Sequence, residues 1–504
     1  MNATTDSTPD CAPDDAVRQA DGTLRQPAWA GAPLWARLRL LMLPALFAVA
    51  LYGLHLQLGH LGLYGFAVVL GLIVLADLRN GPETLLALTV VYLPLSRLYA
   101  ARLAPGLNGT NLLELALVFA WFSDSVRRGQ PLLRRHPFTR VTGIWLALSL
   151  VSVLTAIAAL GLQPFFWKYL QILRTFLDQF IIFFLFVNMI RDRNSARRIL
   201  VYMMFSATLV YLYGIHEWWG TRGLSSIEKS RLLGPVGQPN DYAALVVYSV
   251  APFLAWGAFY FPRWKSLRVA PMVLIGVKVL LGCFSRGAYL AFAMQGLGVS
   301  FVKSRRFFVL VLAVLAGIYL FVPALVPTSL KARVGQTYQD RVPGTGIDKS
   351  ADSRLILWGA AIQMTRDHPL LGEGFDRFSS LVPSHVSGFD DGVTGGATDN
   401  QNMFLYAASN MGLPGLVALV WLVLAVGLAG WRLYADRDAC DIDRIAGLSA
   451  ATMVAGLIGV NMFGTHMIDS SVDGLFWVMA AVLARLLPAR RQRAAPAPAA
   501  QRRG

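Results

Sequence analysis

The sequence predicts an all-α polytopic integral membrane protein, with about 12–14 transmembrane helices and one large loop on its outer face. Of the 504 residues, 55% are hydrophobic and only 15% are charged, and the mean hydropathy is +0.51. An average soluble domain carries about 25% charged residues, so this chain has too few to cover a water-facing surface. Backbone groups in lipid must be hydrogen-bonded within their own segment, so the spans are expected to be helices.

Apolar runs recur along most of the chain, and one span requires about 20 such residues. The expected spans are residues 41–58, 61–77, 83–99, 112–126, 141–162, 168–190, 198–217, 241–261, 269–284, 287–302, 307–325, 403–431, 445–464 and 472–488.

The basic residues predict that both termini face the cytoplasm. With the N-terminus inside, nearly all clustered Lys and Arg fall on one side, as the bias of these residues toward the cytoplasm requires. The loops on that side are 77–81, 127–140, 191–198, 262–268, 303–306, 432–444 and 489–493. The outer face keeps a medium loop near 216–240 and a large loop at 326–402, which holds seven Lys or Arg and nine Asp or Glu.

This pattern divides the chain into five regions. In order, they are a disordered cytoplasmic tail (1–35), transmembrane helices that include the medium loop (36–325), the large loop (326–402), C-terminal transmembrane helices (403–488) and a basic cytoplasmic tail (489–504). The first region lacks the charged-then-apolar order of a cleaved signal peptide.

Composition also excludes several partners. A net charge of +16 would suit nucleic acid, but most of the arginines lie in short loops between spans, so no nucleic-acid partner is expected. Cys11, Cys283 and Cys440 lie far apart, which predicts neither a disulfide framework nor a metal site.

The medium loop contains "SRLLGPVGQPNDYAA" (230–244), where glycines and prolines force turns. Asn240 and Asp241 can cap the helix that follows. Two interpretations of Arg231 stay open. It is either a stray arginine in a tight turn or a planar fork of donors for a phosphate.

A second outer segment, "CFSRGAYLAF" (283–292), places Arg286 between two apolar segments at their outer ends. The cytoplasmic bias of basic residues does not account for it there. An arginine at membrane depth usually faces a cavity or a partner, and Lys278 lies in the preceding apolar run. A cationic site for a lipid-linked anion is favoured over a snorkelling side chain neutralised by a carboxylate.

The large loop contains "DSRLILWGAAIQMTRDHPLLGEGFDRF" (352–378). Leu355, Trp358 and Ile362 recur at helical spacing, which predicts an amphipathic helix over 353–367. Arg354 would lie near Trp358, on the side of this helix that faces either the membrane or the core. Pro369 and Gly372 are expected to end the helix. His368 would then lie at the C-terminal end, where a histidine often bonds free carbonyls.

The sequence contains no nucleophile elbow, P-loop, zinc signature or dinucleotide fingerprint. Instead, its outer segments contain arginines, a few histidines and the polar helix start "TDNQN" (398–402). That combination suits a diphosphate whose oxygens take up the leaving charge.

Four pieces in this order resemble the O-antigen ligase and polymerase family of bacterial envelopes. They are "RLLGPVGQPNDYA", "FSRGAYLA", "SRLILWGAAIQMTRDHPLLGEGFDRF" and "QNMFLYAASNMGLPGL". Each motif is weak alone, but four in one order on one face form a moderately specific signal. The resemblance covers roughly residues 230–430, under half of the chain.

The resemblance implies a glycosyltransferase at the periplasmic face of the bacterial inner membrane, without metal or cofactor. Family members move a glycan from undecaprenyl diphosphate to a hydroxyl of lipid A core sugar, of another lipid-linked repeat or of a protein. Arg231, Arg286 and Arg354 are implied to hold the diphosphate or the sugar near it. Asn240 and Lys278 are further candidates for substrate binding.

One position departs from the family. The resembled ligases carry His-Asn where this chain, aligned back from Gly412–Gly415, has Gln401 and Asn402. A neutral imidazole can take a proton from an acceptor hydroxyl, whereas an amide cannot, so ligase-type catalysis at this position is in doubt. His368 is retained as a further catalytic candidate.

Three explanations remain open for this departure. The base comes from elsewhere in the loop, with His385, Asp399 and Asp391 as candidates. The phosphate leaving group removes the proton itself. Or the chain is a divergent polymerase or an inactive member.

The sequence therefore predicts a glycan ligase or polymerase that uses undecaprenyl-diphosphate-linked polysaccharide in O-antigen or exopolysaccharide synthesis. Gln401 slightly favours polymerisation or an atypical role in exopolysaccharide synthesis. The alternative is a flippase or exporter, but such a protein is expected to show related halves and charges through many spans, which this sequence lacks. An assembly scaffold is a weaker third option.

Overall fold

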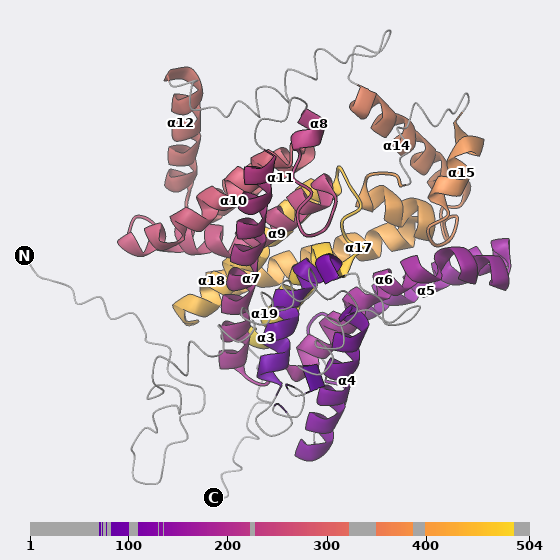
Figure 1. Ribbon diagram of the computed structural model, residues 1–504, viewed down its shortest axis with the longest axis horizontal. Helices are drawn as coiled ribbons and strands as arrows, with labels where there is room; N and C mark the ends of the chain where they lie inside the picture. Colours follow the sequence, from indigo (N-terminus) through magenta and orange to yellow (C-terminus); the bar gives the residue numbers. More distant parts are fainter. Residues whose placement is uncertain are drawn as a thin grey trace, which may run out of the picture.

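The computed structural model describes residues 70–71, 73, 77, 82–99, 109–129, 131–134, 136–221, 227–321, 349–386 and 399–487. The two predicted tails and the span expected at 41–58 lie outside these ranges, as does most of the span expected at 61–77. Within the described ranges all regular secondary structure is helical (Figure 1). The all-α class predicted from the sequence is confirmed.

In chain order, the described helices are α3 (Glu83–Tyr92), η1 (Leu93–Tyr99), α4 (Gly109–Arg128), α5 (Thr139–Leu160), α6 (Leu162–Met189), α7 (Arg193–Gly220), α8 (Ile227–Ser230), α9 (Pro239–Tyr260), η2 (Trp264–Val269), α10 (Ala270–Gly282), α11 (Arg286–Lys303), α12 (Arg305–Phe321), α14 (Lys349–Asp367), α15 (Phe378–His385), α17 (Met403–Ala435), α18 (Asp441–Asn461) and α19 (Ser470–Leu486). Each apolar segment predicted from residue 83 onward coincides with one of these helices, or, at 83–99, with the pair α3 and η1.

Several helices have the length and composition of membrane spans. In the described part of the chain, 6 helices are long and apolar enough to cross a bilayer, namely α5, α6, α7, α9, α17 and α18. Leu150 and Leu154 on α5 are exposed, as are Val309 and Leu315 on α12. Apolar side chains that face outward along such helices are expected to contact lipid. The chain is a multi-pass membrane protein.

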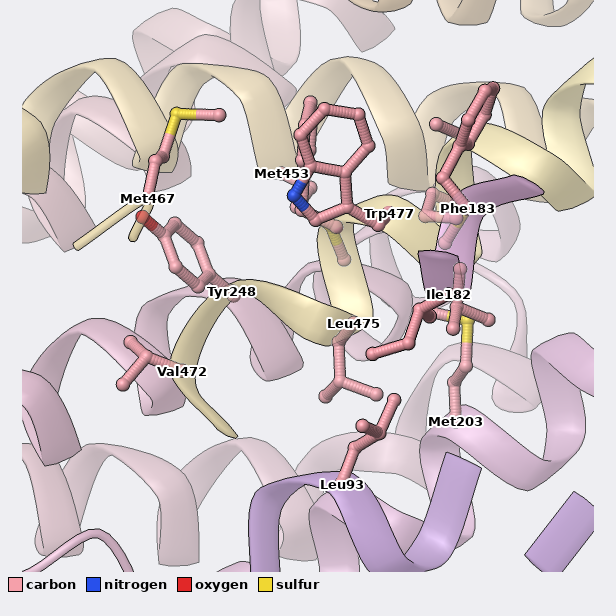
Figure 2. Packing of buried hydrophobic residues seen from close by; sticks show 14 of the residues in the cluster. Leu93, Ile182, Phe183, Met203, Tyr248, Met453, Met467, Val472, Leu475 and Trp477 are labelled. Carbon is pink, nitrogen blue, oxygen red and sulfur yellow. The ribbon is translucent and has the colours of Figure 1, made fainter. Parts of the chain in front are cut away.

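The core of the helical bundle is built around α19. This helix is apolar on nearly all sides and almost every side chain in it is buried, which is expected of a helix surrounded by others. Leu475 and Trp477 of α19 lie among side chains from η1, α6, α7, α9 and α18 (Figure 2). Trp477 donates from Nε1 to Gln179 Oε1 at 2.9 Å and to Asp473 Oδ2 at 3.0 Å.

Helix α17 is broken at the "GLPG" sequence. Gly412 has φ 71° and ψ −176°, outside the helical region, and Pro414 follows inside the helix. A β-carbon on Gly412 would lie 2.6 Å from the carbonyl carbon of Leu370, so only glycine fits both the dihedral angles and the space. The break leaves a short first half, 403–411, ahead of the longer apolar half.

The segment after α14 fills this break and satisfies the freed backbone groups. Leu413 N donates to Pro369 O at 2.8 Å, while Glu373 N and Gly374 N donate to the carbonyls of Ser409 and Asn410 at 2.8 and 3.2 Å. Irregular backbone within membrane helices requires such replacement partners. The loop and the broken helix therefore form one unit, and Figure 1 shows α14 and α15 beside α17.

The helix expected over 353–367 is present as α14, and the structure shows which of its residues are buried. The buried residues are Leu357, Ala360, Ala361 and Met364, which pack against α15. Two of the residues whose spacing predicted this helix, Leu355 and Ile362, are 54% and 42% exposed.

Candidate functional site

A cavity of about 530 Å³ lies at one end of the helical bundle. Its lining comes from five parts of the chain: the end of η1, the first half of α6, the start of α9, the residues before α17, and the loop that joins α18 to the start of α19. The lining residues are Arg97, Lys168, Gln171, Ile172, Thr175, Gln238, Asn240, Asp241, Asp399, Gln401, Phe463, Gly464, Thr465, His466, Ile468, Asp469 and Val472. Two cations, three carboxylates and one imidazole thus share this space.

Three helices begin at the cavity. Their N-caps are Gln238 for α9, Asn402 for α17 and Asp469 for α19, and each side chain accepts a hydrogen bond from the first turn of its own helix. Helix N-termini carry partial positive charge and favour anions. These three N-termini favour a negatively charged ligand, while the cavity's three carboxylates outnumber its two cations. The cap of α9 is Gln238 and not the predicted Asn240–Asp241 pair, because Pro239 takes the first helical position.

Ionic contacts connect four of the lining side chains. His466 Nδ1 lies 3.0 Å from Asp241 Oδ1. Arg97 lies between Asp241, at 3.7 Å, and Asp469, to which it donates from Nη2. Arg97 also donates from Nη1 to Val236 O at 2.7 Å. A carboxylate beside an imidazole fixes both the ring orientation and which nitrogen carries the proton.

The loop that carries His466 is held by buried groups. Asn461, fully buried at the end of α18, accepts from His466 N at 3.0 Å and donates to Tyr248 OH at 2.7 Å. Gly464 provides the space for the ring, since a β-carbon there would lie 2.1 Å from His466 Nε2. The side chain of His466 is only 7% exposed. The imidazole is therefore pre-positioned at the cavity wall.

The same loop is joined to the start of α17. Met403 N donates to Gly464 O at 3.0 Å, and Asn402 Nδ2 donates to Met462 O at 3.2 Å. Asn402 Oδ1 also accepts from Phe404 N and Leu405 N. Gln401 and His466 are consequently brought to one cavity by contacts between two segments that lie far apart in the sequence.

Gln401 adopts an uncommon backbone conformation. Its φ is 46°, in the left-handed region that few residues other than glycine occupy. Gln401 N donates to Asp399 Oδ1 at 3.2 Å, and its side-chain Oε1 accepts from Arg354 Nε at 2.9 Å. Strained residues of this kind cluster at functional sites, and this one presents an amide, held by a guanidinium, to the cavity.

Two carboxylates near the start of α17 lie in a low-polarity environment. Burial raises the pKa of Asp376 to about 7, with Asp399 raising it further and Lys168 opposing the shift. Burial also raises the pKa of Asp399, although its bond with Gln401 N and the nearby His466 oppose this. A protonated carboxyl costs less to bury than a charged one, so burial favours the neutral form of both groups.

The structure brings several of the predicted site residues to the cavity. Asn240 and Gln401 line it. Arg231 lies one contact behind, since its Nη2 donates to Asn240 Oδ1 at 3.0 Å and its Nε donates to Cys283 O at 3.1 Å. Arg354 lies similarly behind Gln401. Arg286 begins α11, where its neighbour Gly287 lies directly against Phe463 of the cavity wall.

Other predicted residues lie elsewhere or have structural contacts. Lys278 stacks its ammonium over the Trp218 ring at 4.1 Å, an ordinary cation–π contact. The side chain of His368 is 59% exposed and lies 3.7 Å from Glu373. His385 bonds Leu381 O at 2.9 Å and lies 3.5 Å from Asp367. Neither histidine is among the lining residues. Asp391 falls outside the described residues.

Arg97, Lys168 and His466 line the cavity but were not predicted from the sequence. A usable signal existed for the two cations, because both lie at the outer ends of predicted spans, where the criterion that selected Arg286 applies equally. His466 lies in the short outer segment between the last two predicted spans, together with Asp469. A histidine and a carboxylate in so short a loop could also have been selected.

Comparison with known proteins identifies one part of the chain. Residues 271–420 match the family model described as O-Antigen ligase. The match runs from α10 to the middle of α17 and includes Arg286, Arg354 and Gln401, whereas His466 lies outside it. No curated protein matches the chain. In the described residues, no group of three or more His, Cys, Asp or Glu is arranged to hold a metal ion.

Proposed function

We propose that this chain, a member of the O-antigen ligase family through residues 271–420, transfers or polymerises a glycan carried on undecaprenyl diphosphate. The reaction takes place at the periplasmic face of the bacterial inner membrane. Both termini of the chain lie in the cytoplasm. The acceptor is a hydroxyl of lipid A core sugar or of another glycan. The product belongs to a cell-surface polysaccharide, either O-antigen or exopolysaccharide.

The observation that carries this proposal is the cavity where three helix N-termini meet Arg97, Lys168 and a positioned imidazole. Loss of a lipid diphosphate from a sugar develops negative charge on phosphate oxygens. Fixed donors and dipoles that face this charge stabilise the transition state without reorganisation. Three further arginines add positive charge near the cavity. Arg231 and Arg354 bond the lining residues Asn240 and Gln401. Arg286 precedes Gly287, which lies against the lining residue Phe463.

The cavity also places acid–base groups beside the anion-binding groups. Glycosyl transfer needs a nucleophilic hydroxyl, a departing diphosphate and a path for one proton. Lining carboxylates and the imidazole provide hydrogen-bond acceptors for sugar hydroxyls. Transfer without a metal ion remains part of the proposal, and activity in the presence of EDTA is the expected result.

One observation favours the alternative function, a flippase or exporter of lipid-linked glycan. Broken helices whose half-helix N-termini face a central site are common in transporters, and α17 has this form. In this chain, however, the break is filled by the segment 369–375 through hydrogen bonds on both sides. That arrangement rigidifies α17 and favours a fixed catalytic site over an alternating gate.

The decisive experiment reconstitutes the purified chain with lipid-linked glycan and candidate acceptors. Transferred or lengthened glycan is expected. If labelled lipid crosses the bilayer while no glycan is transferred, the transporter function replaces this proposal.

Arginine variants test the diphosphate contacts. Arg286→Ala and Arg354→Ala are each expected to abolish transfer, whereas Arg366→Ala, an exposed arginine on the same helix as Arg354, serves as the matched control. Wild-type turnover by both cavity-side variants would rule out the arginine roles.

The orientation is tested separately from the chemistry. An alkaline phosphatase fusion near Gly346 is expected to be active outside the cytoplasm, because the large loop then lies in the periplasm. An inactive fusion with an active reporter in the 127–140 loop would invert the topology and place the cavity on the cytoplasmic side.

A further inference from the structure

We propose that His466 is the general base of the transfer reaction and that Asp241 is the residue that positions it. This inference rests on the proposed function, because it assigns a role within that reaction. It assigns the base to a different element from the one that the family resemblance indicated, since position 401 holds a glutamine. It also lies outside the segment that matches the family model.

The geometry of the pair supports a base with a defined tautomer. Asp241 lies close to both His466 Nδ1, at 3.0 Å, and the guanidinium of Arg97, at 3.7 Å. The neighbouring guanidinium favours the ionised carboxylate, which accepts the Nδ1 proton. Nε2 is then the nitrogen with a free lone pair, and the structure gives it no hydrogen-bond partner among the described residues.

The environment of His466 keeps this arrangement rigid. Its backbone N–H is bound by the buried Asn461, and its ring occupies the space that Gly464 leaves open. The charged groups that face it come from every neighbouring element: Asp241 on α9, Arg97 on η1, Lys168 on α6, Asp399 before α17, and Asp469 in its own loop. A base held on a rigid scaffold loses little entropy when the acceptor binds.

The other candidate bases have contacts that make them less suitable. Gln401 cannot accept a proton, and its amide oxygen is already bonded to Arg354. Asp399 lines the cavity but accepts from Gln401 N, and no side chain orients it as Asp241 orients His466. His368 and His385 do not line the cavity. His466 alone among the described histidines combines cavity exposure with an orienting carboxylate.

His466 Nε2 takes the proton of the acceptor hydroxyl while the oxygen forms a bond to the anomeric carbon of the donor glycan. The bond between that carbon and the phosphate oxygen breaks, and its electron pair stays on undecaprenyl diphosphate. The imidazolium, stabilised by Asp241, then releases the proton to water. Gln401 keeps a binding role, as an amide that donates a hydrogen bond to the sugar or the phosphate.

The test compares His466→Ala and Asp241→Asn with the matched control His216→Gln, an exposed histidine on α7 outside the cavity. Initial transfer rates are measured on the purified full chain, and binding of undecaprenyl diphosphate is measured separately as the donor probe. His466→Ala is expected to lower the transfer rate by about 100- to 10,000-fold and to leave probe binding unchanged. Added imidazole is expected to restore part of the lost rate.

Asp241→Asn probes the positioning role. An asparagine can donate to Nδ1 and so stabilise the tautomer whose Nε2 carries the proton, which leaves no free lone pair facing the acceptor. We expect the transfer rate to fall at least about tenfold, with an altered pH profile. A purely structural role for Asp241 would lower the rate without changing the shape of that profile.

The outcomes separate this inference from the proposed function. If the wild-type chain transfers no glycan, the proposed function fails. If the wild-type chain is active and His466→Ala matches it, His466 is not the base, although the function stands. An inactive His466→Ala that imidazole does not restore, or that loses probe binding, also overturns the assignment. Loss of transfer in Asp399→Asn with activity retained in His466→Ala would move the base to Asp399.

Discussion

Two carboxylates occupy the same position at the starts of different helices, yet their surroundings differ. Asp443 and Asp241 both lie in the first turn of their helices, α18 and α9. Asp443 is 1% exposed and pairs with Arg197 through two bonds, 2.7 and 2.9 Å long. Asp241 is 25% exposed, lies 3.7 Å from Arg97, and opens onto the cavity.

The difference separates a charge used for stability from a charge used for chemistry. Around Asp443 the Arg197 guanidinium bonds both carboxylate oxygens, and the carboxylate is buried. Around Asp241 the arginine is shared with Asp469, and a histidine completes the set. Closed, two-point ion pairs fix a helix contact, whereas the open set leaves donors and acceptors available for a ligand. An aspartate in the first turn of a helix can therefore form either a closed ion pair or an open set, and its position alone does not determine which.

Replacing each arginine by methionine tests this contrast most strongly. Arg197→Met leaves Asp443 buried without its fork, and we expect a loss of about 3 kcal/mol in the free energy of unfolding, at the lower end for broken buried pairs because Arg193 stays 3.7 Å away. Arg97→Met removes a pair that is 39% exposed on the arginine side, so the loss is expected to be about 1 kcal/mol.

Activity is expected to respond in the opposite order. Arg97→Met frees Asp241 and Asp469 from their shared cation and should lower glycan transfer strongly, while Arg197→Met should retain transfer at temperatures where it stays folded. Thermal unfolding in detergent and transfer rates at low temperature measure the two effects. Equal destabilisation by the two variants would remove the distinction between a closed and an open ion pair.

The cavity end also depends on the break in α17, which has no counterpart at the Asp443 end. Gly412→Ala forces a side chain into a left-handed conformation and against the carbonyl carbon of Leu370. We expect a loss of about 1–3 kcal/mol in the free energy of unfolding together with reduced transfer, because Gln401 lies directly before the first half of α17. Gly296→Ala in α11 is the control, since nothing lies within 4 Å of the added carbon; comparable losses in both variants would contradict this role.

The sequence predicted the helices well because the signal for a span is local. The length of the apolar runs located each segment from residue 83 onward. The buried face of α14 was not predictable from spacing, because it depends on how closely α15 packs. In physical terms, spans depend on composition, whereas buried faces depend on tertiary neighbours.

The candidate site was less predictable for the same reason. Asp241 and His466 are 225 residues apart and meet only because α9, α18 and α19 pack together. Gln401 was found because a local motif fixed its position. Arg97 and Lys168 could have been found from their outer-end positions, but no local pattern showed that the two would line one cavity with His466.

Acidity offers a further test at the cavity end. The pKa of Asp376 is raised from 3.8 to about 7, mainly by burial, so between these values the folded chain holds a proton that the unfolded chain has released. Stability is therefore expected to fall as pH rises through this window. Asp376→Asn should remove that dependence, an effect on the order of 1 kcal/mol after solvent screening. Thermal unfolding in detergent at pH 5 and pH 8 measures it, with the exposed Asp438→Asn as control.

The opposite sign is expected at the other end of the bundle, where His136 precedes α5. Burial, followed by the charges of Arg134 and Arg485, lowers the pKa of His136 from 6.5 to about 4, and its buried Nε2 has no hydrogen-bond partner among the described residues. Between these pH values the unfolded chain binds a proton that the folded chain does not, so stability falls as pH falls.

The effect of His136 on stability should be the smallest of those predicted. Its pKa values span about pH 4 to 6.5, and only the part above about pH 5 lies within the range used for detergent-solubilised protein. His136→Asn is expected to lose less thermal stability than the wild type between pH 7 and pH 5, while the exposed His216→Gln should follow the wild type. If His136→Asn loses as much as the wild type, the acid sensitivity of that end arises elsewhere. If the loss is smaller, and Asp376→Asn is more stable than the wild type at high pH, then protons have opposite effects on stability at the two ends. The reason is that burial opposes the charged form of both groups: the protonated form of His136 and the deprotonated form of Asp376.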